Sequence, residues 1–142
     1  MIVDANLLIF AIDTGSPHHP AAAEWWTRTL NSGVAVGLPW QTIGAFLRIS
    51  THPRVAAHPL TAGAAWEFVQ SWLDLPSVWI PAAGTATARI YDDLNRKVHI
   101  TGNLVPDGML AAQAIEHGVE LVSADGDFAR FPGLRWRNPL MA

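Results

Sequence analysis

The chain opens on Met1-Ile2-Val3-Asp4-Ala5-Asn6-Leu7-Leu8. A short apolar run ends at Asp4, and a second, mostly apolar run follows it directly. The first run is typical of a buried strand, because it carries no polar side chain before Asp4. The second run, residues 5–12, is expected to form a short helix that leaves the end of this strand. A strand followed directly by a helix favours a parallel sheet with helices packed on its faces.

The rest of the chain repeats this alternation. Short apolar runs predict further strands at residues 34–37, 78–80, 121–122 and 134–136. Helices are predicted at 20–30, 41–51, from the capping residue Thr61 to Pro76, from Thr85 or Thr87 to Lys97 and at 106–117, with a helical turn at 125–130. Because no repeat, low-complexity tract or linker interrupts the 142 residues, one α/β domain spanning residues 1–142 is expected.

Composition narrows the class of protein. Half of the residues are hydrophobic and 15% are charged, which supplies a sizeable core. The chain has no cysteine, no long apolar span and no signal peptide, so a cytoplasmic protein outside the membrane is expected. The formal charge of −3 does not by itself indicate a nucleic-acid binder. A bound metal would neutralise several of the 12 acids, however, and eight of the nine cationic residues are arginine, which suits phosphate contacts.

Four aspartates stand where predicted strands end or a predicted helix begins. Asp4 ends the first strand, Asp107 lies in the first turn of helix 106–117, and Asp125 and Asp127 follow strand 121–122. Because ligands of open parallel sheets bind at the carboxyl ends of the strands, these side chains are expected to share one crevice. Two carboxylates at 4 Å repel by about 4 kcal/mol at an effective dielectric near 20. A hard divalent cation is the expected ligand that offsets this repulsion.

Three motifs together carry a resemblance to a known family. They are Met1-Ile2-Val3-Asp4-Ala5-Asn6, then Val105-Pro106-Asp107 with Leu110-Ala111-Ala112-Gln113-Ala114, and Ser123-Ala124-Asp125-Gly126-Asp127-Phe128. With Trp40 and the stretch 46–55, they resemble a PIN domain over the whole length of the chain, and more narrowly the VapC toxins of bacterial type II toxin–antitoxin systems. The resemblance implies a three-layer α/β/α fold around a central, mostly parallel sheet of four to five strands.

The resemblance also implies a function. It implies an endoribonuclease that hydrolyses RNA phosphodiester bonds with Mg²⁺, or Mn²⁺ in its place, and acts as the toxin of a toxin–antitoxin pair. The implied partners are an RNA substrate, a cognate VapB-like antitoxin and a second copy of the chain in a homodimer. The implied catalytic and metal-binding residues are Asp4, Asp107 and Asp125, and the implied supporting residues are Asn6, Ser123 and Asp127.

One position departs from the family pattern. Many members carry a glutamate just before the hydrophobic-arginine segment, where this chain has Gly44 or Ala45, and no acid lies between Glu24 and Glu67. Three explanations stay open: the site works with fewer direct ligands, Glu24 or Asp127 compensates, or metal binding is weak. A subset of the family shares the form seen here, so the loss does not predict inactivity.

Contacts with RNA and partners are expected from cationic and aromatic residues. Arg48 and Arg54 are predicted to bind the substrate through its phosphates. Seven tryptophans stand in the chain, and adjacent ones in a helix are not expected to face the same core. At least one of Trp25 and Trp26 is therefore expected on the surface. With Trp66 and Trp72 it would form an apolar area for an antitoxin segment or a dimer partner.

Three alternatives to the ribonuclease remain open. The first is a PIN-like module that binds RNA or a partner with weak or no cleavage, which the missing glutamate favours. The second is a phosphotransferase with Asp4 as nucleophile, although that chemistry usually needs an acid at position 6 and a nearby lysine, and the only lysine is Lys97. The third is an interaction module whose acids are helix caps and turn residues.

Overall fold

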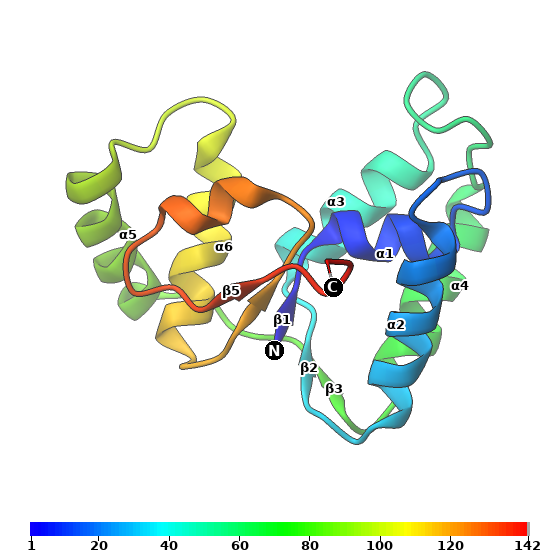
Figure 1. Ribbon diagram of the computed structural model, residues 1–142, viewed down its shortest axis with the longest axis horizontal. Coiled ribbons are helices and arrows are strands. Elements are labelled where there is room, and N and C mark those ends of the chain that lie inside the picture. Colours follow the sequence, from blue (N-terminus) through cyan, green and yellow to red (C-terminus); the bar gives the residue numbers. More distant parts are fainter. Residues whose placement is uncertain (142) are drawn as a thin grey trace.

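The computed structural model describes residues 1–141, and in these residues five short strands form one sheet flanked by six α-helices and one 3₁₀ helix (Figure 1). The strands are β1 (Ile2–Val3), β2 (Val36–Gly37), β3 (Val78–Trp79), β4 (Leu121–Val122) and β5 (Trp136–Arg137). The helices are α1 (Ala5–Ile12), α2 (His19–Asn31), α3 (Trp40–Ser50), α4 (Ala62–Leu73), α5 (Thr85–Val98), α6 (Leu104–Glu116) and the 3₁₀ helix η1 (Gly126–Arg130).

The sheet is parallel throughout, with the strand order β3-β2-β1-β4-β5. In the centre, Ile2 pairs with Leu121 and Val3 with Val122, so β1 and β4 end side by side. β2 and β3 lie on one side of β1, and β4 and β5, which come later in the chain, lie on the other side. This confirms the predicted α/β fold, and it makes the carboxyl ends of β1 and β4 the place where ligands of such sheets bind.

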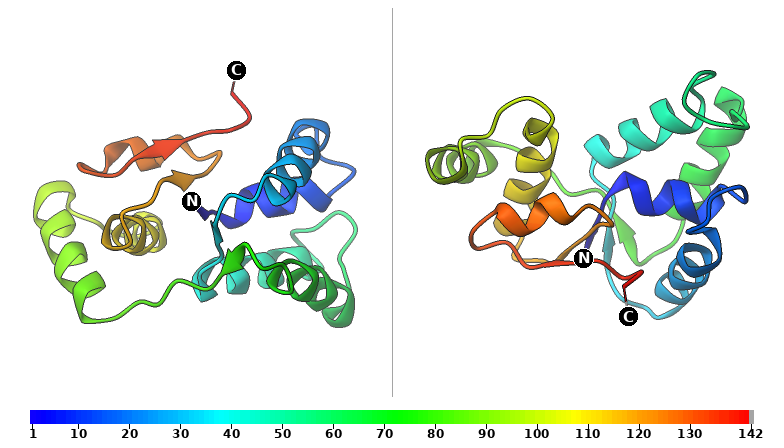
Figure 2. Two further views of the ribbon diagram at one scale, coloured as in Figure 1. Left: turned by 90° about the horizontal axis from the view of Figure 1, so that it is seen from below. Right: turned by 45° about the horizontal axis from the view of Figure 1, so that its top comes forward.

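Helices cover both faces of the sheet, which gives the three layers. Successive strand residues point to opposite faces. Accordingly Val3 and Val122 pack with α1 to α4, whereas Ile2 and Leu121 pack with α5, α6 and η1. Figure 1 and Figure 2 show the two groups of helices on either side of the strands in every view. Among residues 1–141, no helix combines the length and apolar character that crossing a bilayer requires.

The N-terminal turn of α6, which carries Asp107, packs closely against its neighbours. A Cβ atom on Gly108 would lie 2.8 Å from Cδ1 of Ile100 and 3.2 Å from Cε2 of Tyr91. Glycine therefore lets this turn approach α5 and the loop before α6. The same turn begins at Leu104, two residues earlier than predicted, because a proline is tolerated within the first turn, where backbone N–H groups have no helical partner.

The expectation that Trp25 and Trp26 could not both be buried is wrong. Each is 5% exposed, and the Trp26 ring contacts Trp72 edge-on with centroids 5.5 Å apart. Two adjacent helical residues lie about 100° apart around the axis, and an apolar stripe of that width accommodates both. Because Trp72 is buried as well, Trp66 is the one member of the predicted surface group that is exposed, at 40%.

The last strand also differs from its prediction. It occupies Trp136–Arg137 instead of residues 134–136, and its backbone pairs with Leu121 and Val122 of β4. The shift places Trp136 Nε1 within 3.1 Å of the carbonyl oxygen of Ser123, to which it donates a hydrogen bond. The edge strand thus supports the segment that follows β4.

Candidate active site

The carboxyl ends of β1 and β4 bring Asp4 and Ser123 together. Asp4 directly follows β1, and its backbone N–H donates to the carbonyl oxygen of Val122 at 3.0 Å. Its carboxylate caps α1, because Oδ1 accepts from the backbone N–H of Ala5 at 2.8 Å. The second oxygen, Oδ2, accepts from the Ser123 hydroxyl at 2.7 Å. Both carboxylate oxygens of Asp4 therefore have partners that hold them in place.

Ser123 joins the two strand ends into one network. It is fully buried, and its Oγ accepts from Asn6 Nδ2 at 3.1 Å and from the backbone N–H of Asp125 at 3.0 Å. Asn6 Oδ1 in turn accepts from the backbone N–H of Ala124 at 3.3 Å. The structure thus places the predicted supporting residues Asn6 and Ser123 between Asp4 and Asp125.

Asp107 reaches the site from the first turn of α6, facing the strand ends that carry Asp4 and Asp125. One carboxylate oxygen from each of Asp107, Asp125 and Asp127 lies within 4.8 Å of the other two. Asp125 also caps η1, since its Oδ1 accepts from the backbone N–H of Asp127 at 2.9 Å. Asp4 lies outside this tight group of three but lines one hollow together with Asp107. All four predicted acids therefore face the same region of the sheet edge.

Burial and the clustered negative charges raise the pKa values of two of these acids. Burial, followed by the charges of Asp125, Asp4 and Asp127, raises the pKa of Asp107 to about 6. Burial also raises the pKa of Asp4, against the hydrogen bonds from Ser123 and Ala5 that favour its charged form. The carboxylate of Asp107 makes no hydrogen bond and no ion pair with any residue in 1–141.

This donor set fits a hard divalent cation. The groups that face one another are carboxylate oxygens, the ligands that Mg²⁺ and Mn²⁺ prefer. Ser123 orients the Asp4 carboxylate and Asn6 in turn holds Ser123, an arrangement that is usual around bound metals. Two of the acids serve as helix caps, as the structural alternative expected, but Asp107 has no such role.

The structure bears on what replaces the missing glutamate. Ala45 lines the hollow that contains Asp4 and Asp107, so the small side chain leaves open space beside the carboxylates. Glu24 lies exposed on α2, where its carboxylate accepts a hydrogen bond from Arg28 at 3.2 Å. Asp127, by contrast, belongs to the tight acidic group. Of the two proposed substitutes, Asp127 is the one placed to compensate.

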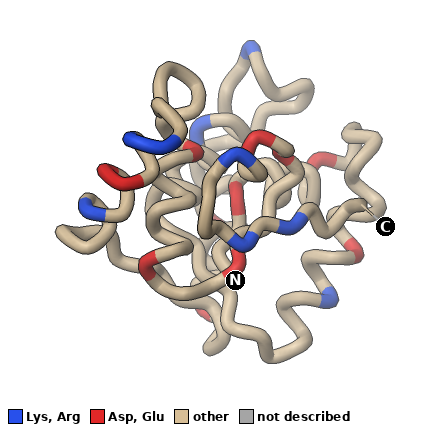
Figure 3. Tube along the Cα trace, turned by 60° about the vertical axis from the view of Figure 1, so that its left-hand side comes forward, with Lys and Arg blue, Asp and Glu red and all other residues tan. Residues whose placement is uncertain are grey.

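The two arginines predicted to bind the substrate lie away from the carboxylates. Arg48 is exposed on α3 and Arg54 is exposed in the loop after it, and neither lines the hollows beside the carboxylates. In the view of Figure 3, lysine and arginine positions are scattered along the trace among acidic ones. Their role in binding stays a prediction.

Sequence reasoning missed Gln41. Its Nε2 donates to the carbonyl oxygen of Pro106 at 2.6 Å, which ties the start of α3 to the turn that carries Asp107. On a helix, residues four apart share a face, so Gln41 and Ala45 both line the hollow with the acids. Gln41 stands four residues before Ala45, which lies where many family members carry the glutamate. This spacing was the signal in the sequence that could have placed Gln41 beside the acids.

The sequence matches the PIN domain family over residues 1–134. The chain belongs to this family. Within it the chain belongs to the VapC group: Ribonuclease VapC33 of Mycobacterium tuberculosis is 41% identical over 140 residues, covering 99% of this chain and 98% of that protein. Ribonuclease VapC37 of the same organism is 40% identical over 141 residues, covering 97% of this chain and 96% of its own length.

The fold of this PIN domain is also found among solved structures. VapBC2 from Rickettsia felis, solved bound to a DNA fragment from its promoter, contains a chain with a TM-score of 0.72 at 15% identity. The match covers 96% of each chain. At this identity the likeness concerns the fold, and it agrees with the parallel α/β architecture described above.

Proposed function

We propose that this PIN domain is a divalent-metal-dependent endoribonuclease that acts as the toxin of a toxin–antitoxin pair. Its similarity over nearly the full length to proteins named as ribonucleases supports the reaction class. The observation that carries the metal dependence is Asp107, a half-buried carboxylate without a hydrogen-bond partner in residues 1–141 and with two further carboxylates within 4.8 Å. A site of this kind is unfavourable for the protein alone and becomes favourable with a cation.

In this proposal Asp4, Asp107 and Asp125 would hold the cation, and Asp127 would complete its oxygen ligands. A divalent cation there supplies Lewis-acid polarisation of the scissile phosphodiester. Ser123 fixes the orientation of Asp4 through the 2.7 Å hydrogen bond and also positions the backbone of Asp125. Gln41 positions the turn that carries Asp107. The chain thus orients its carboxylates before the substrate arrives, which lowers the reorganisation needed during the reaction.

Partners follow from the same similarity. One solved neighbour is a VapBC complex, which supports a VapB-like antitoxin as the partner of this chain. RNA is the proposed substrate, since the sequence relatives are named ribonucleases. The homodimer expected from the resemblance remains a prediction, which analytical ultracentrifugation of the purified protein measures.

The decisive experiment is cleavage of total bacterial RNA by the purified protein, followed by sequencing of the new RNA ends. We expect defined cleavage sites with Mg²⁺ or Mn²⁺, and none with EDTA or with the Asp107→Asn variant. Asparagine keeps the shape of the side chain and removes its charge, so this variant serves as the matched control. Cleavage that persists unchanged in EDTA would falsify the metal-dependent mechanism.

A binding module without cleavage is the second candidate. The observation that favours it is Ala45, which leaves the hollow beside Asp4 and Asp107 without a further carboxylate. This candidate predicts that RNA is retained by the protein in a gel-shift experiment but is recovered uncut after incubation with Mn²⁺.

A further inference from the structure

Two hollows flank the carboxylates and meet at Asn6. One, of about 240 Å³, contains Asp4 and Asp107. The other, of about 380 Å³, contains Asp125 and opens toward the α1–α2 turn and the C-terminal segment. The second volume falls within the range of about 300–1,000 Å³ typical of ligand sites. An RNA strand that crosses the carboxylates would therefore extend into this second hollow, the Asp125-side hollow.

The residues that line the two hollows contain no lysine or arginine. Among them His18, in the Asp125-side hollow, is the single side chain able to carry a positive charge. This matters because an RNA backbone brings several phosphates near a site that is itself rich in carboxylates. A phosphate next to the scissile one needs a hydrogen-bond donor, and among the lining residues His18 is the one that suits a phosphate best, because its N–H donates whether the ring is neutral or charged.

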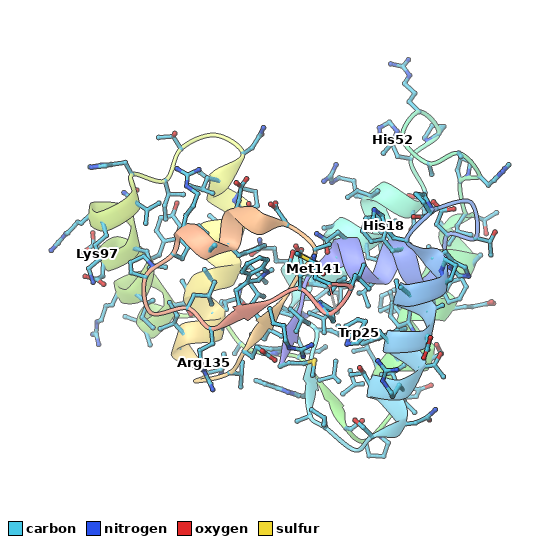
Figure 4. The ribbon with its side chains drawn as sticks, in the orientation of Figure 1. His18, Trp25, His52, Lys97, Arg135 and Met141 are labelled. Atoms are coloured by element: carbon cyan, nitrogen blue, oxygen red, sulfur yellow. The ribbon has the colours of Figure 1, made fainter. Side chains whose placement is uncertain are left out.

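His18 is held in place without using its ring nitrogens. Its ring packs against Phe10 with centroids 4.6 Å apart, and Phe10 lines the same hollow. Its backbone N–H donates to the Ser16 hydroxyl at 3.1 Å, and its carbonyl oxygen accepts from Ala22 at 3.0 Å. The ring nitrogens make no hydrogen bond to residues 1–141, and the side chain does not cap α2. Figure 4 shows His18 beside α1, with Met141, another residue lining this hollow, nearer the centre of the molecule.

We propose that His18 binds the RNA phosphate that neighbours the scissile one on the Asp125 side. The inference rests on the proposed ribonuclease function and deepens it, because it identifies a substrate-binding residue outside the acidic group. The neighbouring histidine is unsuited to this task, because the His19 ring is already within 3.0 Å of the carbonyl oxygen of Phe10. The contact fixes the register of the strand on the carboxylates.

The test combines a mutation of His18 with chemical modification of single phosphates in the RNA, in the manner of a double-mutant cycle. The shortest RNA that the wild-type protein cleaves with Mg²⁺ is resynthesised with one uncharged methylphosphonate linkage at each position in turn. At the linkage that His18 contacts, we expect kcat/KM of the wild-type protein to fall about tenfold, as for the loss of one hydrogen bond to a charged group. His18→Ala should lose the same factor on natural RNA, mainly through KM, and should lose nothing more on the RNA modified at that linkage.

Two further variants separate this contact from a structural effect. His18→Gln keeps an N–H donor and should recover part of the loss. His58→Ala removes an exposed histidine from the loop between α3 and α4 and should cleave like the wild-type protein. Thermal melting of each variant reports whether the fold is retained.

The outcomes distinguish the two proposals. If the wild-type protein cleaves RNA in an Asp107-dependent manner but His18→Ala cleaves equally well, the His18 contact is wrong and the ribonuclease stands. If the losses from His18→Ala and from the methylphosphonate multiply at every linkage, His18 acts without touching a phosphate and the contact is again wrong. If no RNA is cleaved by the wild-type protein, both proposals fall.

Discussion

The two halves of the acidic site are held in different ways. At the strand ends, Asp4 and Asp125 cap helices and are connected through Ser123 by hydrogen bonds of 2.7 to 3.0 Å. On the facing helix α6, Asp107 makes no hydrogen bond to residues 1–141, and its pKa is raised to about 6. The strand-end half is therefore tied by hydrogen bonds into the folded framework, whereas Asp107 on α6 has no such partner, and its charge is the one that the proposed cation would compensate. Mutations at the strand ends should therefore lower both stability and activity, whereas a mutation of Asp107 should lower activity alone.

The largest expected effect comes from Asp107→Asn. If Asp107 is a metal ligand as proposed, its loss should reduce cleavage by about a thousandfold or more, because metal stabilisation of the transition state amounts to several kcal/mol. The free energy of unfolding in EDTA should stay the same or rise, since the variant removes a negative charge that has no partner. Urea unfolding and RNA cleavage by the same preparation check both expectations. A variant that cleaves like the wild-type protein would remove Asp107 from the site.

Asp4→Ala should abolish cleavage too but, unlike the α6 variant, should also destabilise the protein. It removes the cap of α1, which costs about 0.5–2 kcal/mol, and leaves the buried hydroxyl of Ser123 without its acceptor. Urea unfolding in EDTA measures the loss. Equal stability of Asp4→Ala and the wild-type protein would contradict the difference between the two halves.

Ser123→Ala tests the network that joins the strand ends. Asp4, Asn6 and the backbone of Asp125 are half-buried and each lose their partner on the buried Ser123, so the free energy of unfolding should fall by about 1–3 kcal/mol. Because the residue orients proposed ligands, Mn²⁺ affinity should fall by about 10- to 100-fold. Isothermal titration of Mn²⁺ gives the affinity, and Ser71→Ala, an exposed serine on α4, serves as the control. An unchanged affinity with lowered stability would limit Ser123 to folding.

Much of the framework was predictable from the sequence. Strand ends and helix starts follow from the alternation of apolar runs and turn residues, and strand ends of a parallel sheet meet at one edge. That rule sufficed to predict that Asp4 and Asp125 lie close together, and the position of Asp107 in the first turn of the predicted helix 106–117 placed it in the same crevice. The catalytic role of these residues stays a prediction until the variants are measured.

Other parts of the site depend on how segments far apart in the chain pack together. Gln41 approaches Pro106 only because α3 and α6, far apart in the chain, pack at the same end of the sheet. His18 belongs to the site only through the turn between α1 and α2, which looks like an ordinary loop in the sequence. The burial of both Trp25 and Trp26 depends on how wide a surface α2 buries, which adjacency in the sequence does not reveal.

Ala45→Glu adds an acid to the hollow where Asp4 and Asp107 already face each other. Metal affinity depends on the number of charged oxygen ligands, so Mn²⁺ affinity should rise, by about tenfold. Without metal the extra charge should lower the free energy of unfolding. Ala45→Gln is the matched control, since it has the same size without the charge. Affinity that rises equally in both variants would mean that side-chain size, not charge, controls the site.

The smallest effect is the contribution of Asp107 to the pH dependence of stability. The pKa of Asp107 is raised from 3.8 to about 6, so between these values the folded protein holds a proton that the unfolded chain has released. The free energy of unfolding in EDTA should therefore fall as pH rises through this range. Asp4, whose pKa is also raised, adds to the same trend. In Asp107→Asn the fall should be shallower by about 1 kcal/mol or less, because solvent screens a partly exposed carboxylate. Urea unfolding of both proteins across this pH range gives the difference, and parallel curves would mean that Asp107 makes no such contribution.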